Sequence, residues 1–169
     1  MKFWIGILLI FVTVITVSSG MYLNKTSALV KESPVIKAPG YDMSIDFADK
    51  YKSDLEHVCN YLDRYDYKFI YWNQSSPNKL EYSTGELSGT ITVKGKTEKR
   101  MFSSLKQGGL KRIVKKSDSA AFVLWSEYDL SSGLVYGKNG KPDFQYDNMN
   151  VKLKKCGDSE NWYCYRMER

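Results

Sequence analysis

The amino-terminal run Phe3–Leu23 constrains this chain more than any other feature of its sequence. It holds 21 residues without a charged side chain, and it lies between Lys2 and Lys25. A helix of that length, at about 1.5 Å per residue, spans roughly 30 Å, the thickness of the hydrocarbon core of a bilayer. Lys2 favours a cytoplasmic amino terminus by the positive-inside rule. We therefore expect residues 1–23 to direct the rest of the chain out of the cytoplasm.

A retained anchor and a cleaved signal peptide are the two interpretations of this segment. A signal peptide would have its apolar core at Phe3–Val17, followed by the small residues 18–20 that a peptidase requires. However, Met21–Leu23 continue the apolar run, and Tyr22 is typical of a membrane–water interface. The uncleaved anchor is therefore the favoured interpretation.

The remainder is predicted to form a linker and one extracytoplasmic domain. Residues 24–44 lack periodicity and contain Pro34, Pro39 and Gly40, which is typical of a tether. Residues 45–169 have the length of one ordinary domain. The whole chain is 43% hydrophobic and 14% aromatic, which is enough apolar material to form a core with a bias toward strands.

The domain begins with a helical pattern and continues with strands. Apolar residues recur every three or four positions between Asp46, a candidate N-cap, and Tyr65. Strands are then predicted at residues 67–72, 80–83, 89–94, 110–115, 120–127, 133–137, 149–156 and 161–167, with a short helix at 99–107. Asn139-Gly140 indicates a hairpin lengthened by Pro142. Short connections favour antiparallel neighbours, so we expect an α+β fold with the first helix packed on a curved antiparallel sheet or a small β-barrel.

The chain has three cysteines, and export would place them in an oxidising compartment. Cys156 and Cys164 flank a turn-rich stretch on the last two predicted strands, so facing positions would bring them within disulfide range. A Cys156–Cys164 disulfide is therefore favoured. Cys59, on the apolar helix face, is then expected to be a buried small side chain, and the rival pairing joins it to one of the other two.

No catalytic or metal-binding pattern stands out in the sequence. His57 is the single histidine, and the helical pattern places it on the polar face, where a solvated role is the common outcome. Cys59 lies two residues away and so on another side of the helix, which excludes a Cys–His dyad. We expect a non-enzyme without a cofactor or metal.

Basic residues are concentrated in one stretch of the domain. They are Lys94, Lys96, Lys99, Arg100, Lys106, Lys111, Arg112, Lys115 and Lys116. Nine cations and the single acid Glu98 give this stretch a local charge of +8, more than the +6 of the whole chain. Such a run forms either a solvated face or a docking face for an acidic partner or anionic lipid. Export and the lack of interleaved aromatic residues argue against nucleic acid.

The order of a short cytoplasmic end, the span Phe3–Leu23 and the domain at 45–169 resembles a class of bacterial accessory proteins. These are the small ToxS-, VtrC- and PsaF/MyfF-like partners of membrane-bound transcription regulators in Gram-negative bacteria. The resemblance implies a single-pass inner-membrane protein whose periplasmic domain, a helix and a small barrel, binds and stabilises or modulates a regulator. A periplasmic immunity protein against a secreted toxin and a structural envelope protein are the alternatives.

A small signal molecule is a further ligand that this layout permits. Aromatic residues able to line a cavity are Tyr71, Trp72, Trp125, Tyr136, Trp162 and Tyr163. The competing interpretation assigns the same residues to the plain core of the domain, which is the commoner use of buried aromatic side chains.

Overall fold

A computed structural model describes residues 38–168 apart from residues 129, 143 and 145–149. The anchor predicted at residues 1–23 and most of the linker predicted at 24–44 lie outside the described residues. Within the described part, neither helix has the length and apolar character needed to span a membrane.

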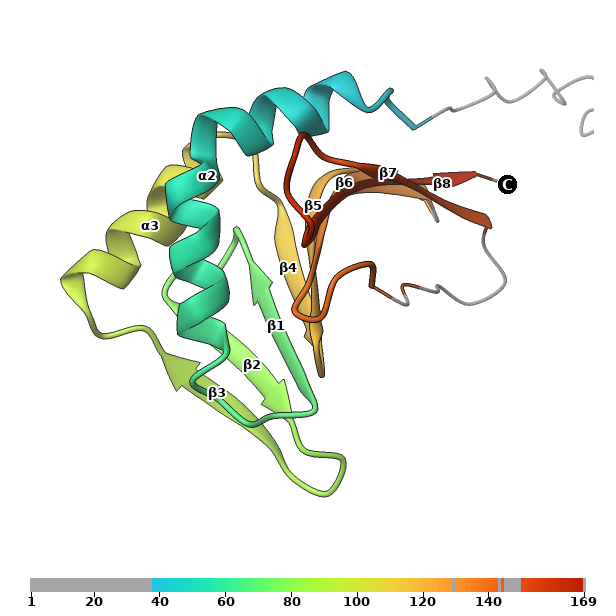
Figure 1. Cartoon of the computed structure of the whole chain (residues 1–169). Coiled ribbons are helices and arrows are strands. Elements are labelled where there is room, and N and C mark those ends of the chain that lie inside the picture. The colour runs from blue at the N-terminus through green and yellow to red at the C-terminus, as the bar shows by residue number, and fades with distance from the viewer. Residues whose placement is uncertain (1–37, 129, 143, 145–149, 169) are drawn as a thin grey trace, which may run out of the picture. The chain divides into compact units, whose positions relative to one another are not determined.

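The described residues form two helices and one sheet (Figure 1). In chain order the elements are α2 (Asp42–Leu62), β1 (Phe69–Asn73), β2 (Lys79–Ser83), β3 (Ser88–Thr92), α3 (Lys96–Gln107), β4 (Arg112–Lys116), β5 (Ser119–Glu127), β6 (Leu130–Gly137), β7 (Asn150–Lys155) and β8 (Trp162–Glu168). The strands pair antiparallel in the order β3-β2-β1-β4-β5-β6-β8-β7. This confirms the α+β class and the antiparallel sheet.

The sheet is open, so the barrel alternative is wrong. Its outermost strands, β3 and β7, each pair with one neighbour only among the described residues. The hairpin predicted at Asn139-Gly140 is also wrong, because β6 pairs with β8 and β7 lies outside β8. Gly140 instead closes a tight turn directly after β6, where its N–H bonds the carbonyl of Gly137 at 3.2 Å.

Helix α2 begins at Asp42, four residues before the predicted start. Asp46 therefore lies inside the helix and is not its N-cap, which is Tyr41. Tyr51 has non-helical dihedral angles (φ −114°, ψ 19°), and the helix bends there. Its ring packs against the end of α3, where a Cβ on Gly108 would lie 2.5 Å from the Tyr51 ring. Glycine at 108 thus permits the close approach of the two helices.

The core lies between the helices and one face of the sheet. Side chains alternate along each strand, so Ile70 and Trp72 of β1 and Ile113 of β4 face the helices and are almost fully buried. Trp72 stacks on Phe102 of α3 with ring centroids 5.5 Å apart. Both helices therefore cover the same face of the sheet (Figure 1) and leave the other face for different use.

The strands β5 and β6 bend where the sequence permits close backbone contact. The pairing register shifts between Val123 and Trp125, which marks a bulge in β5. Opposite this point, a Cβ on Gly133 would lie 2.0 Å from the carbonyl oxygen of Phe122. Only glycine fits there, and the bend curves the sheet away from the helices (Figure 1).

Candidate ligand groove

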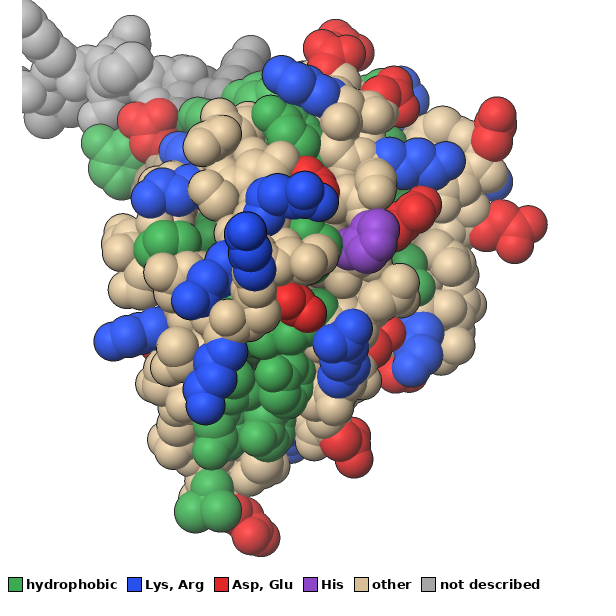
Figure 2. All heavy atoms as spheres, turned by 90° about the vertical axis from the view of Figure 1, so that its left-hand side faces the viewer, with side chains coloured by type: hydrophobic (Ala, Val, Ile, Leu, Met, Phe, Trp, Pro, Cys, Tyr) green, Lys and Arg blue, Asp and Glu red, His purple; other side chains and the backbone are tan. Residues whose placement is uncertain are grey.

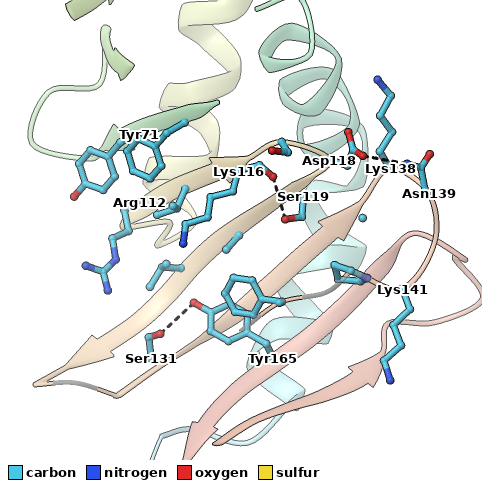
Figure 3. A pocket seen from close by; sticks show the side chains of 18 of the residues that line it. Tyr71, Arg112, Lys116, Asp118, Ser119, Ser131, Lys138, Asn139, Lys141 and Tyr165 are labelled. Carbon is cyan, nitrogen blue, oxygen red and sulfur yellow. Dashed lines mark hydrogen bonds between the residues drawn. The ribbon is translucent and has the colours of Figure 1, made fainter. Parts of the chain in front are cut away.

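A groove of about 700 Å³ lies on the sheet face opposite the helices. Strands β1, β4, β5, β6 and β8 contribute to it, and residues 138–142 after β6 form one side (Figure 3). This volume falls in the range of small-molecule binding sites. The curvature at Gly133 and the chain that follows β6 together produce the hollow.

The floor of the groove is apolar, and the polar atoms beneath it have hydrogen-bond partners within the protein. Val114, Ala121 and Val123 form it together with Tyr165 and Met167. The Tyr165 hydroxyl donates to Ser131 Oγ at 3.3 Å, and the Ser131 hydroxyl in turn donates to Met167 Sδ at 3.2 Å. These bonds satisfy the polar atoms of Ser131 and Tyr165, both of which are almost fully buried beneath the groove.

The rim of the groove is cationic. Arg112 and Lys116 extend from β4 on one side, and Lys141 lies on the opposite side (Figure 3). Lys138 also lines this side, but its Nζ turns toward Asp63, 3.9 Å away. Asp118 is the one acid among the described lining residues, so four cations and one anion give a net charge of +3. An apolar floor beneath a positive rim is complementary to a molecule with an apolar body and an anionic head.

Backbone contacts position the two sides of the rim. Arg112, Val114 and Lys116 share a face because side chains on a strand alternate. On the other side, the Lys138 N–H donates to the carbonyl of Asp118 at 2.8 Å, and Asn139 Nδ2 donates to Asp118 Oδ2 at 3.3 Å. The turn before β5 therefore fixes the chain leaving β6 at the groove.

The basic stretch predicted as one docking face is divided among three places. Lys94, Lys96, Lys99, Arg100 and Lys106 are exposed at and around α3 (Figure 2). Arg112 and Lys116 line the groove on the far side of the sheet, and Lys111 is half-buried just before β4. The nine cations of this stretch therefore do not share one surface, and the docking role of the exposed group on α3 stays a prediction.

Lys115 was expected on an exposed basic face, but it is buried. It points to the helix side of the sheet and is 7% exposed. Its Nζ lies 3.5 Å from Asp63 Oδ1, and Lys138 Nζ lies 3.9 Å from Asp63 Oδ2. Lys115 thus has a structural partner at the end of α2 and is not available to a docking partner.

The three cysteines are buried thiols in the structure. Cys156 and Cys164 lie on neighbouring segments, since the Cys156 N–H bonds the carbonyl of Trp162. A hydrogen bond from Cys164 lowers the pKa of Cys156, and the same bond and burial raise that of Cys164. Burial also raises the pKa of Cys59, as expected for a packed thiol. The register pairs Cys164 with Lys154, so Cys156 and Cys164 are diagonal neighbours and not the directly facing pair that was expected. The Cys156–Cys164 disulfide stays a prediction.

Only one of the aromatic residues proposed for a cavity lines the groove. Tyr71 does so, whereas Trp72 and Trp162 belong to the core between sheet and helices. Phe69, Phe144 and Tyr165 line the groove and were missed. The alternation of side chains in β8 could have placed Tyr165 on the face of the sheet that Cys164 does not occupy. Only the strand order shows that this face lines the groove.

His57 is exposed on α2, as predicted for the polar helix face (Figure 2). Its Nδ1 lies 2.6 Å from the carbonyl oxygen of Ser53 one turn earlier, and this is a contact within the helix. Among the described residues, no cluster of histidine, cysteine or acidic side chains could hold a metal ion. Comparison of the chain with protein-family models, curated proteins and solved structures finds no match.

Proposed function

We propose that this chain is an inner-membrane-anchored periplasmic accessory protein that binds an amphipathic anion and modulates a membrane-bound transcription regulator. The observation that carries the proposal is the groove with its apolar floor and net charge of +3. The uncharged segment Phe3–Leu23 supports the anchor, and the layout of the chain supports the regulator as partner.

The groove favours binding over catalysis. A hydrocarbon body would lie against the half-buried Phe69, Tyr71 and Val114, and each buried methylene would contribute about 0.8 kcal/mol. An anionic head would lie between the cations of β4 and those after β6. Each exposed cation would contribute about 0.2–1 kcal/mol, so the apolar body supplies most of the affinity and the rim supplies the selectivity for anions.

Binding is tested with a matched series of probes on the full chain in lipid nanodiscs. Octanoate and decanoate differ by two methylenes, so decanoate is expected to bind about tenfold more tightly. Decanol lacks the charge, and decyltrimethylammonium reverses it; both are expected to bind more weakly than decanoate. Titration calorimetry against empty nanodiscs measures each affinity. Equal affinity for the cationic and anionic probes would contradict the proposed selectivity.

Point variants separate the groove from the rest of the surface. Lys116→Ala is expected to weaken decanoate binding several-fold, because it removes a rim cation. Lys99→Ala removes an equally exposed cation on α3, on the other side of the sheet, and is the matched control. Weakening by both variants to the same extent would point to non-specific attraction of anions.

The regulatory part is tested by deleting the gene and measuring transcription of the neighbouring operon. Val114→Trp, which fills the groove while leaving the chain in the membrane, is expected to change the response to added anion but not the abundance of the protein. Unchanged expression of every neighbouring gene on deletion would exclude the accessory role while leaving ligand binding intact.

An immunity protein is the second candidate, and the exposed cations of α3 favour it. Lys96, Lys99, Arg100 and Lys106 are all exposed on α3, and an exposed group of cations suits an acidic protein partner. Figure 2 shows several lysine and arginine side chains on this side of the molecule. Under this function, the double reversal K99E/R100E would abolish protection against a co-expressed toxin, and Val114→Trp would leave it intact.

A further inference from the structure

The two edges of the sheet differ in how they are protected against pairing with another strand. The outer strand β7 carries Lys152, Lys154 and Lys155, and Lys152 forms an ion pair of 2.5 Å with Glu168 of β8. Lysines on an edge strand oppose the addition of a further strand. The opposite edge, β3, has the sequence Ser-Gly-Thr-Ile-Thr and carries no charge and no proline.

Among the described residues, no strand pairs with the outer side of β3. Its hairpin with β2 fixes which residues bond inward, since Val93 N–H bonds the carbonyl of Asn78 and Thr84 N–H bonds that of Leu87. In an antiparallel ladder the inward-bonding residues alternate with the outward-facing ones. The N–H and C=O groups of Ser88, Thr90 and Thr92 therefore point away from the sheet, and all three residues are exposed.

The residues that flank β3 identify the occupant of this edge. Glu86 and Lys94 lie four positions before and four positions after Thr90. Antiparallel pairing of two β3 strands about Thr90 would place each Glu86 opposite Lys94 of the second strand. Glu86 lies in the turn just before β3 and Lys94 lies just after the strand, so the two ends of β3 carry opposite charges that face each other in this register.

We propose that two copies of this chain associate through their β3 edges, antiparallel and centred on Thr90, to form one continuous sheet. Thr90 faces its own counterpart, and Ser88 faces Thr92 in both directions. These are hydrogen-bonded pairs, each exchanging two N–H···O=C bonds. The dimer does not depend on a ligand in the groove, which lies on the strands beyond β2.

An exposed apolar side chain agrees with this register. Leu87 is 71% exposed directly before β3 and is one of three large hydrophobic side chains exposed in the described part of the chain. In the proposed pairing Leu87 lies opposite Val93 of the second copy and diagonal to its Ile91. Diagonal neighbours across an antiparallel pair are within reach of such side chains. Association would therefore cover Leu87 against the half-buried Ile91.

Cysteine cross-linking of the full chain in its membrane tests both the pairing and the register. In Thr90→Cys, the two introduced cysteines would have Cα atoms about 5.5 Å apart, which is within disulfide range. Mild oxidation is expected to give a reducible band at twice the mass of the chain. Thr92→Cys is the matched control, because its two copies would be offset by four residues, roughly 14 Å along the strands.

Charge reversal tests the self-complementary flanks. Glu86→Lys places two lysines opposite each other at both ends of the interface, and it is expected to weaken association about tenfold. The double variant E86K/K94E restores opposite charges and is expected to restore the cross-link of Thr90→Cys. A merely destabilised chain would not be rescued in this way.

Proline at the same edge tests the backbone bonds. Thr90→Pro removes an N–H that points outward, so the fold is expected to persist while the dimer is lost in light scattering of the detergent-solubilised chain. The proposal is overturned if Thr90→Cys gives no dimer band, if Thr92→Cys cross-links equally well, or if Thr90→Cys cross-links instead to a protein of another mass.

Discussion

The two faces of the sheet are built from neighbouring residues of the same strands, yet they serve different ends. On β4, Ile113 is 1% exposed beneath the helices, whereas Val114 is half-buried in the floor of the groove. The helix face supplies the stability of the domain. The groove face also buries large side chains, among them Tyr165 and Met167, but Val114 itself is only half-buried. Changes at Val114 should therefore alter binding with little cost in stability.

The largest expected difference between the faces is that between Ile113→Ala and Val114→Ala. Ile113→Ala leaves a cavity in the core and is expected to lower the free energy of unfolding by about 2–5 kcal/mol. Val114→Ala, one residue later, is expected to cost less than about 1 kcal/mol. Urea unfolding followed by tryptophan fluorescence measures both. Similar losses would mean that the groove face is also packed as core.

The second largest expected effect is the loss of stability on reducing the predicted disulfide at the edge of the helix face. A chain purified from the inner membrane is expected to gain the mass of two hydrogens on reduction, and peptide mapping should join Cys156 to Cys164. Reduction is expected to cost at most about 3 kcal/mol, since the loop between them is short. Cys59 should react with iodoacetamide only after unfolding, because it is buried and its pKa is raised. Free Cys156 and Cys164 would refute the bridge.

Lys115 and Lys116 repeat the comparison with charged residues. Lys115→Ala removes the buried partner of Asp63 and is expected to cost about 1–3 kcal/mol, less than a fully buried pair because Asp63 is partly exposed. Lys116→Ala is expected to leave stability within about 0.5 kcal/mol and to weaken the binding of decanoate. Thermal unfolding should show a loss of stability for Lys115→Ala only, and calorimetry should show a loss of decanoate affinity for Lys116→Ala only. Loss of decanoate affinity in Lys115→Ala alone would contradict the assignment of faces.

These lysines also show what could be predicted from the sequence. The helices and strands were placed within a few residues because their periodicity is local. The alternation of Ile113, Val114 and Lys115 already implied that adjacent cations lie on opposite sides of the sheet, and one docking face was expected in spite of that signal. Lys115 finds its partner only through the end of α2, which is a contact between distant parts of the chain.

The groove itself was beyond sequence reasoning. It depends on β8 inserting between β6 and β7, whereas Asn139-Gly140 favoured a hairpin between consecutive strands. It also depends on the bend at Gly133, whose need for glycine is set by the Phe122 carbonyl on a neighbouring strand. Local propensity carries no information about either contact, so a positive rim over an apolar floor could not be assembled from residue patterns alone.

Asp118→Asn should have the smallest effect, and it tests the electrostatics of the groove face alone. Asp118 Oδ2 accepts a hydrogen bond from Asn139, and the oxygen of an asparagine at 118 can accept the same bond, so stability should not change measurably. Loss of this acid raises the net charge of the described lining from +3 to +4. At about 0.2–1 kcal/mol for one exposed charge, decanoate should bind up to roughly fivefold more tightly.

The gain from Asp118→Asn should disappear at high salt, because the Debye length falls from about 10 Å at 0.1 M to 3 Å at 1 M. The hydrocarbon contribution persists under the same conditions, so decanoate should still bind better than octanoate. Calorimetry at the two salt concentrations separates these contributions. Unchanged affinity in low salt would place the anionic head away from Asp118, toward the cations of β4, and would assign selectivity to Arg112 and Lys116 alone.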